Sequence, residues 1–225
     1  MESFSLVNRA FAVFAKDLRL ELRTKYALNT ILMFGVTALA LVSFSLGQSG
    51  LPTRLLAALF WIVMFFSAMA ALAQVFTREE EAGTALALRL NAEPTCVYLG
   101  KLSFNLALLS ILSAVVTPMF FIFTDAPADN VLLFVLVMIV GVLALCSSTT
   151  LVAAIISKAS VKGALFAVLS FPILLLPLML LVGATDTVLM GRGLAELWAP
   201  LQGLIAYIGV MVTASLMLFK HVWQA

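Results

Sequence analysis

Six long stretches without a charged residue dominate this sequence and leave it few ways to fold. They cover residues 27–46, 55–76, 102–124, 131–156, 163–184 and 199–219. Each is close to the ~20 residues that an α-helix needs to cross a hydrocarbon core of ~30 Å. A segment in lipid must satisfy its own backbone hydrogen bonds, and the alternating pattern of barrel strands is missing. We therefore predict an all-α polytopic protein, with residues 1–225 forming a single membrane domain.

The composition leaves little room for a soluble domain or for a nucleic-acid partner. Hydrophobic residues make up 64% of the chain and charged residues only 11%, against about one half and one quarter in soluble domains. The formal net charge of +2 is too small to indicate nucleic-acid binding. Membrane lipid is the partner that this composition predicts.

The basic residues between the apolar stretches predict the orientation of the chain. If the N-terminus is cytoplasmic, eleven of the 13 lysines and arginines fall on the cytoplasmic side, and only Arg54 and Arg192 fall on the other. Basic residues accumulate in cytoplasmic loops. We therefore expect both termini in the cytoplasm of a bacterium, with the spans in its inner membrane. The segment 185–198 on the outer side is predicted to form a short surface or re-entrant helix.

Residues 3–25 have the pattern of an amphipathic helix. Apolar residues recur at three- and four-residue intervals, and the basic residues Arg9, Lys16, Arg19 and Arg23 fall on other faces. Glu21 forms a favourable pair with Lys25, four residues later. Such a helix lies in the membrane interface with its apolar side toward lipid. Two roles remain open: a simple anchor, or an elbow that transmits motion to the spans. The charged start of the chain also leads us to expect no cleavable signal peptide.

The segment between the second and third spans is the most informative connection. Thr77 and Glu80 have the spacing of a capping box, and Glu79–Glu81 would favour the positive end of a new helix. A short cytoplasmic helix over 78–90 is therefore predicted, with its acidic start and exposed leucines offered to a partner protein. The alternative is a solvated loop whose charges only fix the topology.

Several functional groups are missing from the sequence. It has no GxxxxGK[ST] loop for ATP and no ionisable residue at the centre of a span, which argues against an ATPase and against proton or sodium coupling. The sole histidine, His221, lies at a span end, and Cys96 and Cys146 have no metal-like spacing. We expect no catalytic residue, no metal ligand and no cofactor bound by this chain.

Two features within the spans bear on movement and packing. Pro172 and Pro177 each remove a backbone donor, which makes the fifth span the candidate hinge. The run Ser147–Thr150 is the densest polar patch in the membrane. Close helix packing is its favoured interpretation, and contact with a substrate is the alternative.

Three segments carry a resemblance to a known family. Residues 16–29, the run 76–90 with its Arg-Glu-Glu-Glu-Ala-Gly-Thr core, and residues 99–102 resemble haem exporter protein B, the permease of the cytochrome c maturation system. The resemblance in length and span number covers the whole chain. It implies an ABC-2-like exporter permease, and it assigns a coupling helix that docks on the ATPase to Arg78, Glu79, Glu80, Glu81, Gly83, Thr84, Leu86 and Arg89.

The same resemblance implies the partners and leaves rival functions open. The partners would be a cytoplasmic ATPase, haem exporter protein A, which binds the ATP, then the C and D subunits, and a second copy of this chain. Haem would be a substrate of the whole complex. One rival is an ABC exporter of lipid, polysaccharide or drug. Another is a scaffold subunit that moves no substrate, and a membrane enzyme comes third because catalytic groups are missing.

Overall fold

The computed structural model describes residues 2–46, 51–72, 92–127, 129–156 and 162–224, together with 75, 76, 79, 83, 84, 88 and 90. Within this part of the chain it contains only helices: α1 (Glu2–Thr24), α2 (Tyr26–Leu46), α3 (Thr53–Leu72), α6 (Pro94–Thr124), α7 (Val131–Ile156), α8 (Lys162–Leu189) and α9 (Leu194–Gln224). All except α1 are long and apolar enough to cross a membrane. The predicted all-α bundle of six spans is confirmed.

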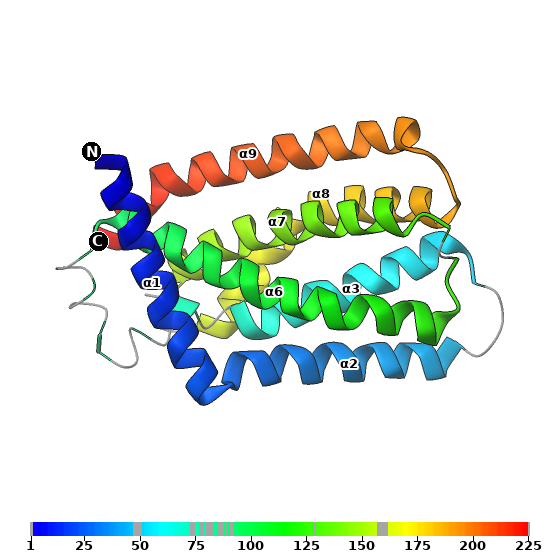
Figure 1. Cartoon of the computed structure of the whole chain (residues 1–225), viewed down its shortest axis with the longest axis horizontal. Helices are drawn as coiled ribbons and strands as arrows, with labels where there is room; N and C mark the ends of the chain where they lie inside the picture. The colour runs from blue at the N-terminus through cyan, green and yellow to red at the C-terminus, as the bar shows by residue number, and fades with distance from the viewer. Residues whose placement is uncertain are drawn as a thin grey trace.

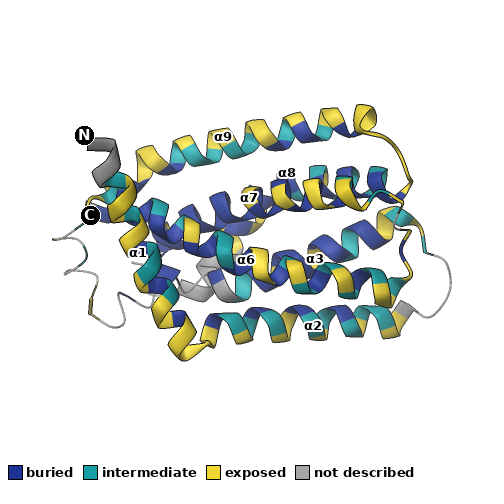
Figure 2. Cartoon of the chain, in the orientation of Figure 1, coloured by how far each residue is buried: buried dark blue, intermediate teal, exposed yellow. Residues whose placement is uncertain are grey.

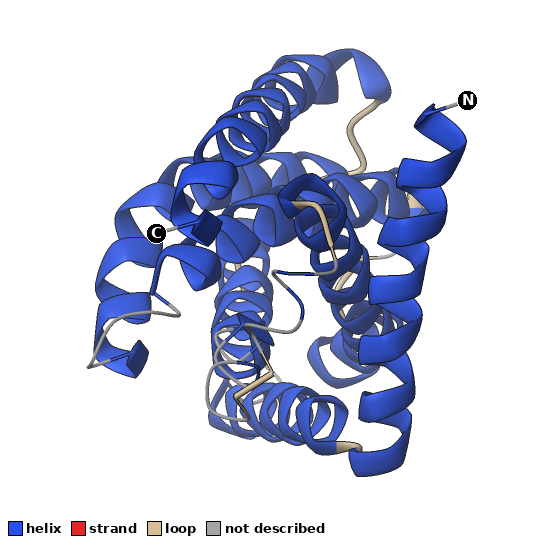
Figure 3. Cartoon of the chain, turned by 90° about the vertical axis from the view of Figure 1, so that its left-hand side faces the viewer, coloured by secondary structure: helices blue, strands red, loops and turns tan. Residues whose placement is uncertain are grey.

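The six long helices lie side by side, and α1 crosses one end of them (Figure 1). Both termini lie at this end, as an even number of spans requires. The view from that end shows α1 running along the side of the bundle (Figure 3), where it packs mainly against α6. This position of α1, across one end of the spans, is the one expected of a helix at a membrane interface. Its placement on a membrane surface stays a prediction.

Helix α7 forms the centre of the bundle, and α9 forms an outer edge. In the most apolar stretch of each helix, 61% of the residues of α7 are buried, but only 17% of the residues of α9. Figure 2 shows the same contrast along the two helices. In the core, the Phe60 ring packs edge-on against Phe120 and Phe134, at centroid distances of 5.0 and 5.5 Å. The exposed apolar surface is what a bundle surrounded by lipid requires.

The third span begins earlier than the sequence predicts. The sequence predicts it over 102–124, because Lys101 lies just before this uncharged run, but α6 starts at Pro94. Proline suits the first turn of a helix, where its missing N–H costs no hydrogen bond. Lys101 therefore lies inside the helix, and it is fully buried. Hydropathy alone could not show that this charge has partners.

The predicted surface helix over 185–198 is wrong. Helix α8 continues to Leu189 and α9 already begins at Leu194, so a connection of only four residues, 190–193, joins them. Gly191 turns the chain there with a φ of 70°, a conformation that glycine adopts without steric cost. The helix extends through polar residues because they have partners: Thr185 accepts a hydrogen bond from the Trp61 indole, and Asp186 accepts one from Thr53.

The prolines of the fifth span lie inside a continuous α8. Pro177 has no N–H to offer to the carbonyl of Ile173, four residues earlier. In the structure, the Tyr207 hydroxyl of α9 donates to that carbonyl over 2.9 Å, and Ser148 of α7 lies 2.7 Å from the same hydroxyl. The proline thus creates a polar link between three helices. Whether Pro172 and Pro177 act as a hinge stays a prediction.

Candidate functional site: a buried ion cluster beneath the elbow helix

The Lys101 ammonium group lies in the interior at the end of the bundle that α1 crosses. Only 1% of the residue is exposed. Its Nζ donates to the carbonyl of Val75 over 2.9 Å, and it lies 3.2 Å from Asp17 Oδ2 and 3.0 Å from Glu79 Oε1. The Phe76 ring lies 5.2 Å from the same nitrogen. A buried ammonium is tolerated only with such a set of partners, since burial of an isolated charge is very costly.

Two carboxylates and a second lysine complete the cluster. Lys16 Nζ lies 3.2 Å from Asp17 Oδ1 and also contacts Glu79 Oε1. Asp17 and Glu79 are both more than nine-tenths buried, whereas the Lys16 side chain is half exposed. We call these four residues the ion cluster: Lys16, Asp17, Glu79 and Lys101. Its two positive and two negative charges cancel, which is the condition for keeping them out of water.

The cluster joins three parts of the chain that lie far apart in the sequence. Lys16 and Asp17 belong to α1, Glu79 to the segment between α3 and α6, and Lys101 to the second turn of α6. Arg9 and Glu93 form another pair between α1 and the start of α6, at 2.9 Å, but this pair is exposed. An exposed pair contributes little. The buried cluster is therefore the main polar connection among the three parts.

The pKa of Lys16 is raised above its ordinary value. Burial by itself lowers it, but the hydrogen bond to Glu79 and the charges of Asp17 and Glu79 outweigh that effect. A lysine with a raised folded-state pKa contributes stability that is fully present below its unfolded value of about 10.4 and is lost only as the pH rises through the higher folded value. The charge of Lys16 is thus maintained throughout the neutral range.

The inner face of α1 explains how the carboxylate of Asp17 reaches Lys101. Val13, Asp17 and Glu21 are spaced four residues apart and are all buried. Glu21 also accepts a hydrogen bond from the backbone N–H of Leu28 over 2.8 Å, which fastens the corner between α1 and α2. Lys25 turns this corner with a φ of 52°. Arg19 and Arg23, the other predicted elbow residues, are exposed.

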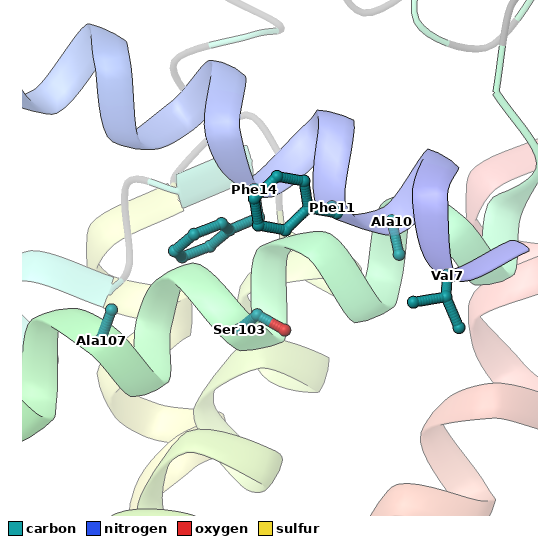
Figure 4. A pocket seen from close by; sticks show the side chains of 6 residues that line it. All are labelled: Val7, Ala10, Phe11, Phe14, Ser103 and Ala107. Atoms are coloured by element: carbon teal, nitrogen blue, oxygen red, sulfur yellow. The ribbon is translucent and has the colours of Figure 1, made fainter.

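A glycine lets α1 and α6 approach each other closely. A Cβ atom on Gly100 would lie 2.7 Å from Val13 Cβ and 2.8 Å from the carbonyl oxygen of Ala10. Beside this contact, Phe11 and Phe14 lie over Ser103 and line an apolar hollow of about 330 Å³ between the two helices (Figure 4). Because Gly100 precedes Lys101, the close contact and the ion cluster depend on the same helix spacing.

We expect Gly100→Ala to separate α1 from α6. The new methyl group would need a shift of several tenths of an ångström, because Cβ contacts below 3.0 Å are essentially never seen. Since α1 packs mainly against α6, a small shift of α1 would disturb few contacts with the other spans. The cost should therefore be about 1 kcal/mol, at the low end for overpacking. Cysteine crosslinking between α1 and α6 would measure the separation. Gly209→Ala, where a Cβ meets nothing within 4 Å, is the matched control, and equal crosslinking in both variants would contradict the prediction.

The predicted coupling helix over 78–90 is only partly described. Arg78, Glu80, Glu81, Leu86 and Arg89 lie outside the described residues. Glu79 is helical, but Gly83 lies in a turn with a φ of 67°. The backbone N–H of Thr84 bonds to the carbonyl of Glu79 over 3.0 Å, and the described residues Leu88 and Leu90 are helical. One uninterrupted helix over 78–90 is therefore wrong at Gly83, where the left-handed backbone stops it.

Sequence reasoning selected Glu79 and Lys16 but missed Asp17 and Lys101. We treated Glu79 as an exposed contact for a partner, whereas its side chain points into the protein. Its Oε2 is buried and has no hydrogen-bond partner among the described residues. The four-residue spacing of Val13, Asp17 and Glu21 was the available signal, because it places two acids on one face of α1.

The buried polar residues of α7 bond within the bundle, as the packing interpretation predicts. Ser147, Ser148, Thr149 and Thr150 each donate to a carbonyl of the preceding turn of α7. Thr150 also accepts a hydrogen bond from Asn105 of α6 over 2.8 Å. In the described part of the chain, no group of His, Cys, Asp and Glu side chains could hold a metal ion.

Comparison with known proteins then decides the family. Residues 8–222 match the family described as CcmB protein, the haem exporter protein B family. The chain belongs to this family. No curated protein matches the sequence. The match covers most of α1, all four residues of the ion cluster and all six candidate spans.

Membership in the CcmB family also sets the broad function. The chain is a permease component of the haem exporter system of cytochrome c maturation, a role consistent with its not being an enzyme itself. It is a multi-pass membrane protein. This finding separates it from exporters of lipid, polysaccharide or drug, which the sequence features alone left open.

Proposed function

We propose that this chain couples ATP hydrolysis in a separate ATPase subunit to haem export, or to release of the haem-loaded periplasmic chaperone, during cytochrome c maturation. The ATPase would be haem exporter protein A, and the C and D subunits would complete the complex. Family membership and the missing phosphate-binding loop support this division of labour. ATP would bind to the partner, and haem would be a substrate of the complex.

The buried position of Glu79 is the observation that carries this proposal. Its carboxylate contacts Lys16 of α1 and Lys101 of α6. A force applied to the segment around Glu79 would therefore act on the elbow helix and on the third span together. Coupling between distant sites requires such a connected element with two arrangements. We infer that movement of the ATPase shifts this segment, and that the ion cluster passes the shift to α1 and α6.

The proposal includes a topology and a copy number. With the end crossed by α1 in the cytoplasm of a bacterium, the excess of basic residues faces inward, in agreement with the positive-inside rule. Both termini lie at that end (Figure 1). A permease that works with a pair of ATPase subunits would itself be present in two copies.

The test replaces acidic residues of the coupling segment without touching the ion cluster. Glu80→Lys with Glu81→Lys, and with Glu79 retained, should lower the ATPase activity that the membrane subunit stimulates by about tenfold. The bundle itself should stay folded, since the cluster is unchanged. The reason is that the two lysines would reverse the charge of the acidic surface that is predicted to contact the ATPase. Co-purification with the ATPase, followed by phosphate release, gives the measurement.

Glu196→Lys is the matched control, because it changes an exposed acidic residue at the opposite end of the bundle. It should leave stimulated hydrolysis unchanged. If Glu80→Lys with Glu81→Lys also leaves it unchanged, this segment does not couple to the ATPase.

The scaffold function has one specific observation in its favour. The hydroxyls of the polar patch in α7 bond to carbonyls of their own helix, so they do not form a polar path for a substrate. A chain that moves partners mechanically would need no such path. An ATPase-inactive complex that still releases the haem-loaded chaperone would support the scaffold function over the coupled one.

A further inference from the structure

A groove opens on the side of the bundle between α3 and α8, at the end opposite α1. Its volume is about 320 Å³, which is within the range of small-molecule sites. The lining is apolar, with aromatic side chains prominent, except for one cation, Arg54, in the first turn of α3. The groove is thus amphipathic, and its charge lies at one end.

The Trp61 ring forms part of the inner wall of the groove, and its neighbours hold it in place. Its indole N–H donates to Thr185 Oγ1 of α8 over 2.8 Å. Behind the ring lies Gly141 of α7, where a Cβ would come within 2.1 Å of the indole. The ring therefore has no room to move inward, so the groove is preformed.

The groove has the length of one leaflet of a bilayer. Arg54 lines one end, and at the other end Phe65 of α3 meets Phe171 of α8 with ring centroids 6.4 Å apart. Phe65 lies eleven positions after Arg54, which is about 16 Å along a helix and close to half of a ~30 Å hydrocarbon core. The cation therefore lies at headgroup level when the aromatic end lies near the bilayer centre.

Arg54 is available to an anionic ligand. The residue is exposed, and among the described residues it forms no salt bridge. The nearby carboxylate of Asp186 instead accepts a hydrogen bond from Thr53 over 2.6 Å. Guanidinium groups bind phosphate through paired N–H donors, which makes an unpaired arginine at headgroup level suited to a phosphodiester.

We propose that the groove between α3 and α8 binds one anionic phospholipid, with its phosphate on Arg54 and an acyl chain along the half-exposed Ile62 and Phe66. Charge complementarity selects the headgroup, and the length of the groove fits a chain that descends to the bilayer centre. Such a lipid would fill the space between the two helices. It would act as a specific ligand rather than as exchanging bulk lipid.

The experiment measures lipid retention by the detergent-purified chain. Phosphatidylglycerol or phosphatidylcholine is added, and native mass spectrometry counts the lipids that stay bound. We expect one retained phosphatidylglycerol per chain and about tenfold weaker retention in Arg54→Gln, the effect of losing a charge-assisted contact. Arg192→Gln removes the other arginine at this end, one that is paired with Glu196, and should retain lipid as the unmodified chain does.

A second variant tests the acyl part of the site while Arg54 is present. Leu175 is half exposed on α8 and lines the groove, so Leu175→Trp should fill the space without disturbing the core and should also reduce retention. Equal retention in Arg54→Gln and the unmodified chain, or equal retention of both phospholipids, would overturn the proposal. Displacement of the lipid by haemin would show that a carboxylate amphiphile is the occupant. The assay contains no ATPase, so its outcome is independent of the proposed coupling.

Discussion

Replacement of Lys101 by methionine should destabilise the bundle by about 3–5 kcal/mol, the usual cost of breaking a buried ion pair from one side. Among the described residues, Lys101 is the only buried cation that lies beside both Asp17 and Glu79. The two buried carboxylates would then share Lys16 alone, whose side chain is half exposed. Denaturant titration of the purified chain in mild detergent would measure the loss as a lower free energy of unfolding.

A compensating change distinguishes charge from packing in this prediction. Adding Asp17→Asn to Lys101→Met returns the ion cluster to neutrality, so the double variant should be more stable than Lys101→Met alone. Residues in one network are expected to be non-additive in this way. Lys220→Met removes an exposed lysine near the C-terminal end of α9 and should have almost no effect. A Lys101→Met variant as stable as the unmodified chain would refute the buried cluster.

Gly141→Ala should destabilise the core by about 2–3 kcal/mol, although alanine is the better helix former by about 1 kcal/mol. A Cβ atom at this position would lie 2.1 Å from Cη2 of Trp61 and 3.0 Å from Leu181 Cδ2. The indole cannot yield easily, because its N–H is bonded to Thr185 and its ring packs edge-on against Phe60 at 5.4 Å. A fall in the thermal unfolding midpoint of the detergent-solubilised chain would record the clash.

Gly209→Ala is again the control, since nothing lies within 4 Å of its ideal Cβ. It should be neutral or slightly stabilising, because alanine reduces the entropy of the unfolded chain. The cost of Gly141→Ala should also shrink when Trp61→Phe removes the second aromatic ring. If Gly141→Ala unfolds at the same temperature as the unmodified chain, α7 and α3 are not packed as tightly as the structure shows.

The proposed coupling and the proposed lipid site lie at opposite ends of the bundle, and α3 connects them. Val75 and Phe76, just beyond the described end of α3, contact Lys101, whereas Arg54 lies in its first turn. The ion cluster would receive force from the ATPase, and the lipid would hold α3 against α8 at the other end. The lipid-retention and ATPase assays test these two roles separately.

The sequence by itself determined the six spans, the amphipathic first helix and the family resemblance. These follow from local properties: the length of uncharged runs is set by the thickness of a bilayer, and amphipathicity depends only on helical spacing. The same reasoning misplaced the start of α6 and the ends of α8 and α9. At the start of α6 and the end of α8, Lys101 and Asp186 each have a partner from a distant part of the chain. Near the start of α9, Glu196 pairs with Arg192 only four residues away.

Only the tertiary structure decided the candidate site. The sequence predicts that Lys101 marks the start of a span and that Glu79 contacts a partner protein, because an isolated charge belongs in water. The folded chain instead brings Asp17 and Lys16 to them, so four charges cancel in the interior. Likewise, Gly100 and Gly141 are unremarkable in sequence, and their importance comes from the helices that press against them. Residues that are dozens of positions apart leave no periodic pattern in the sequence, so only the folded structure shows that they are in contact.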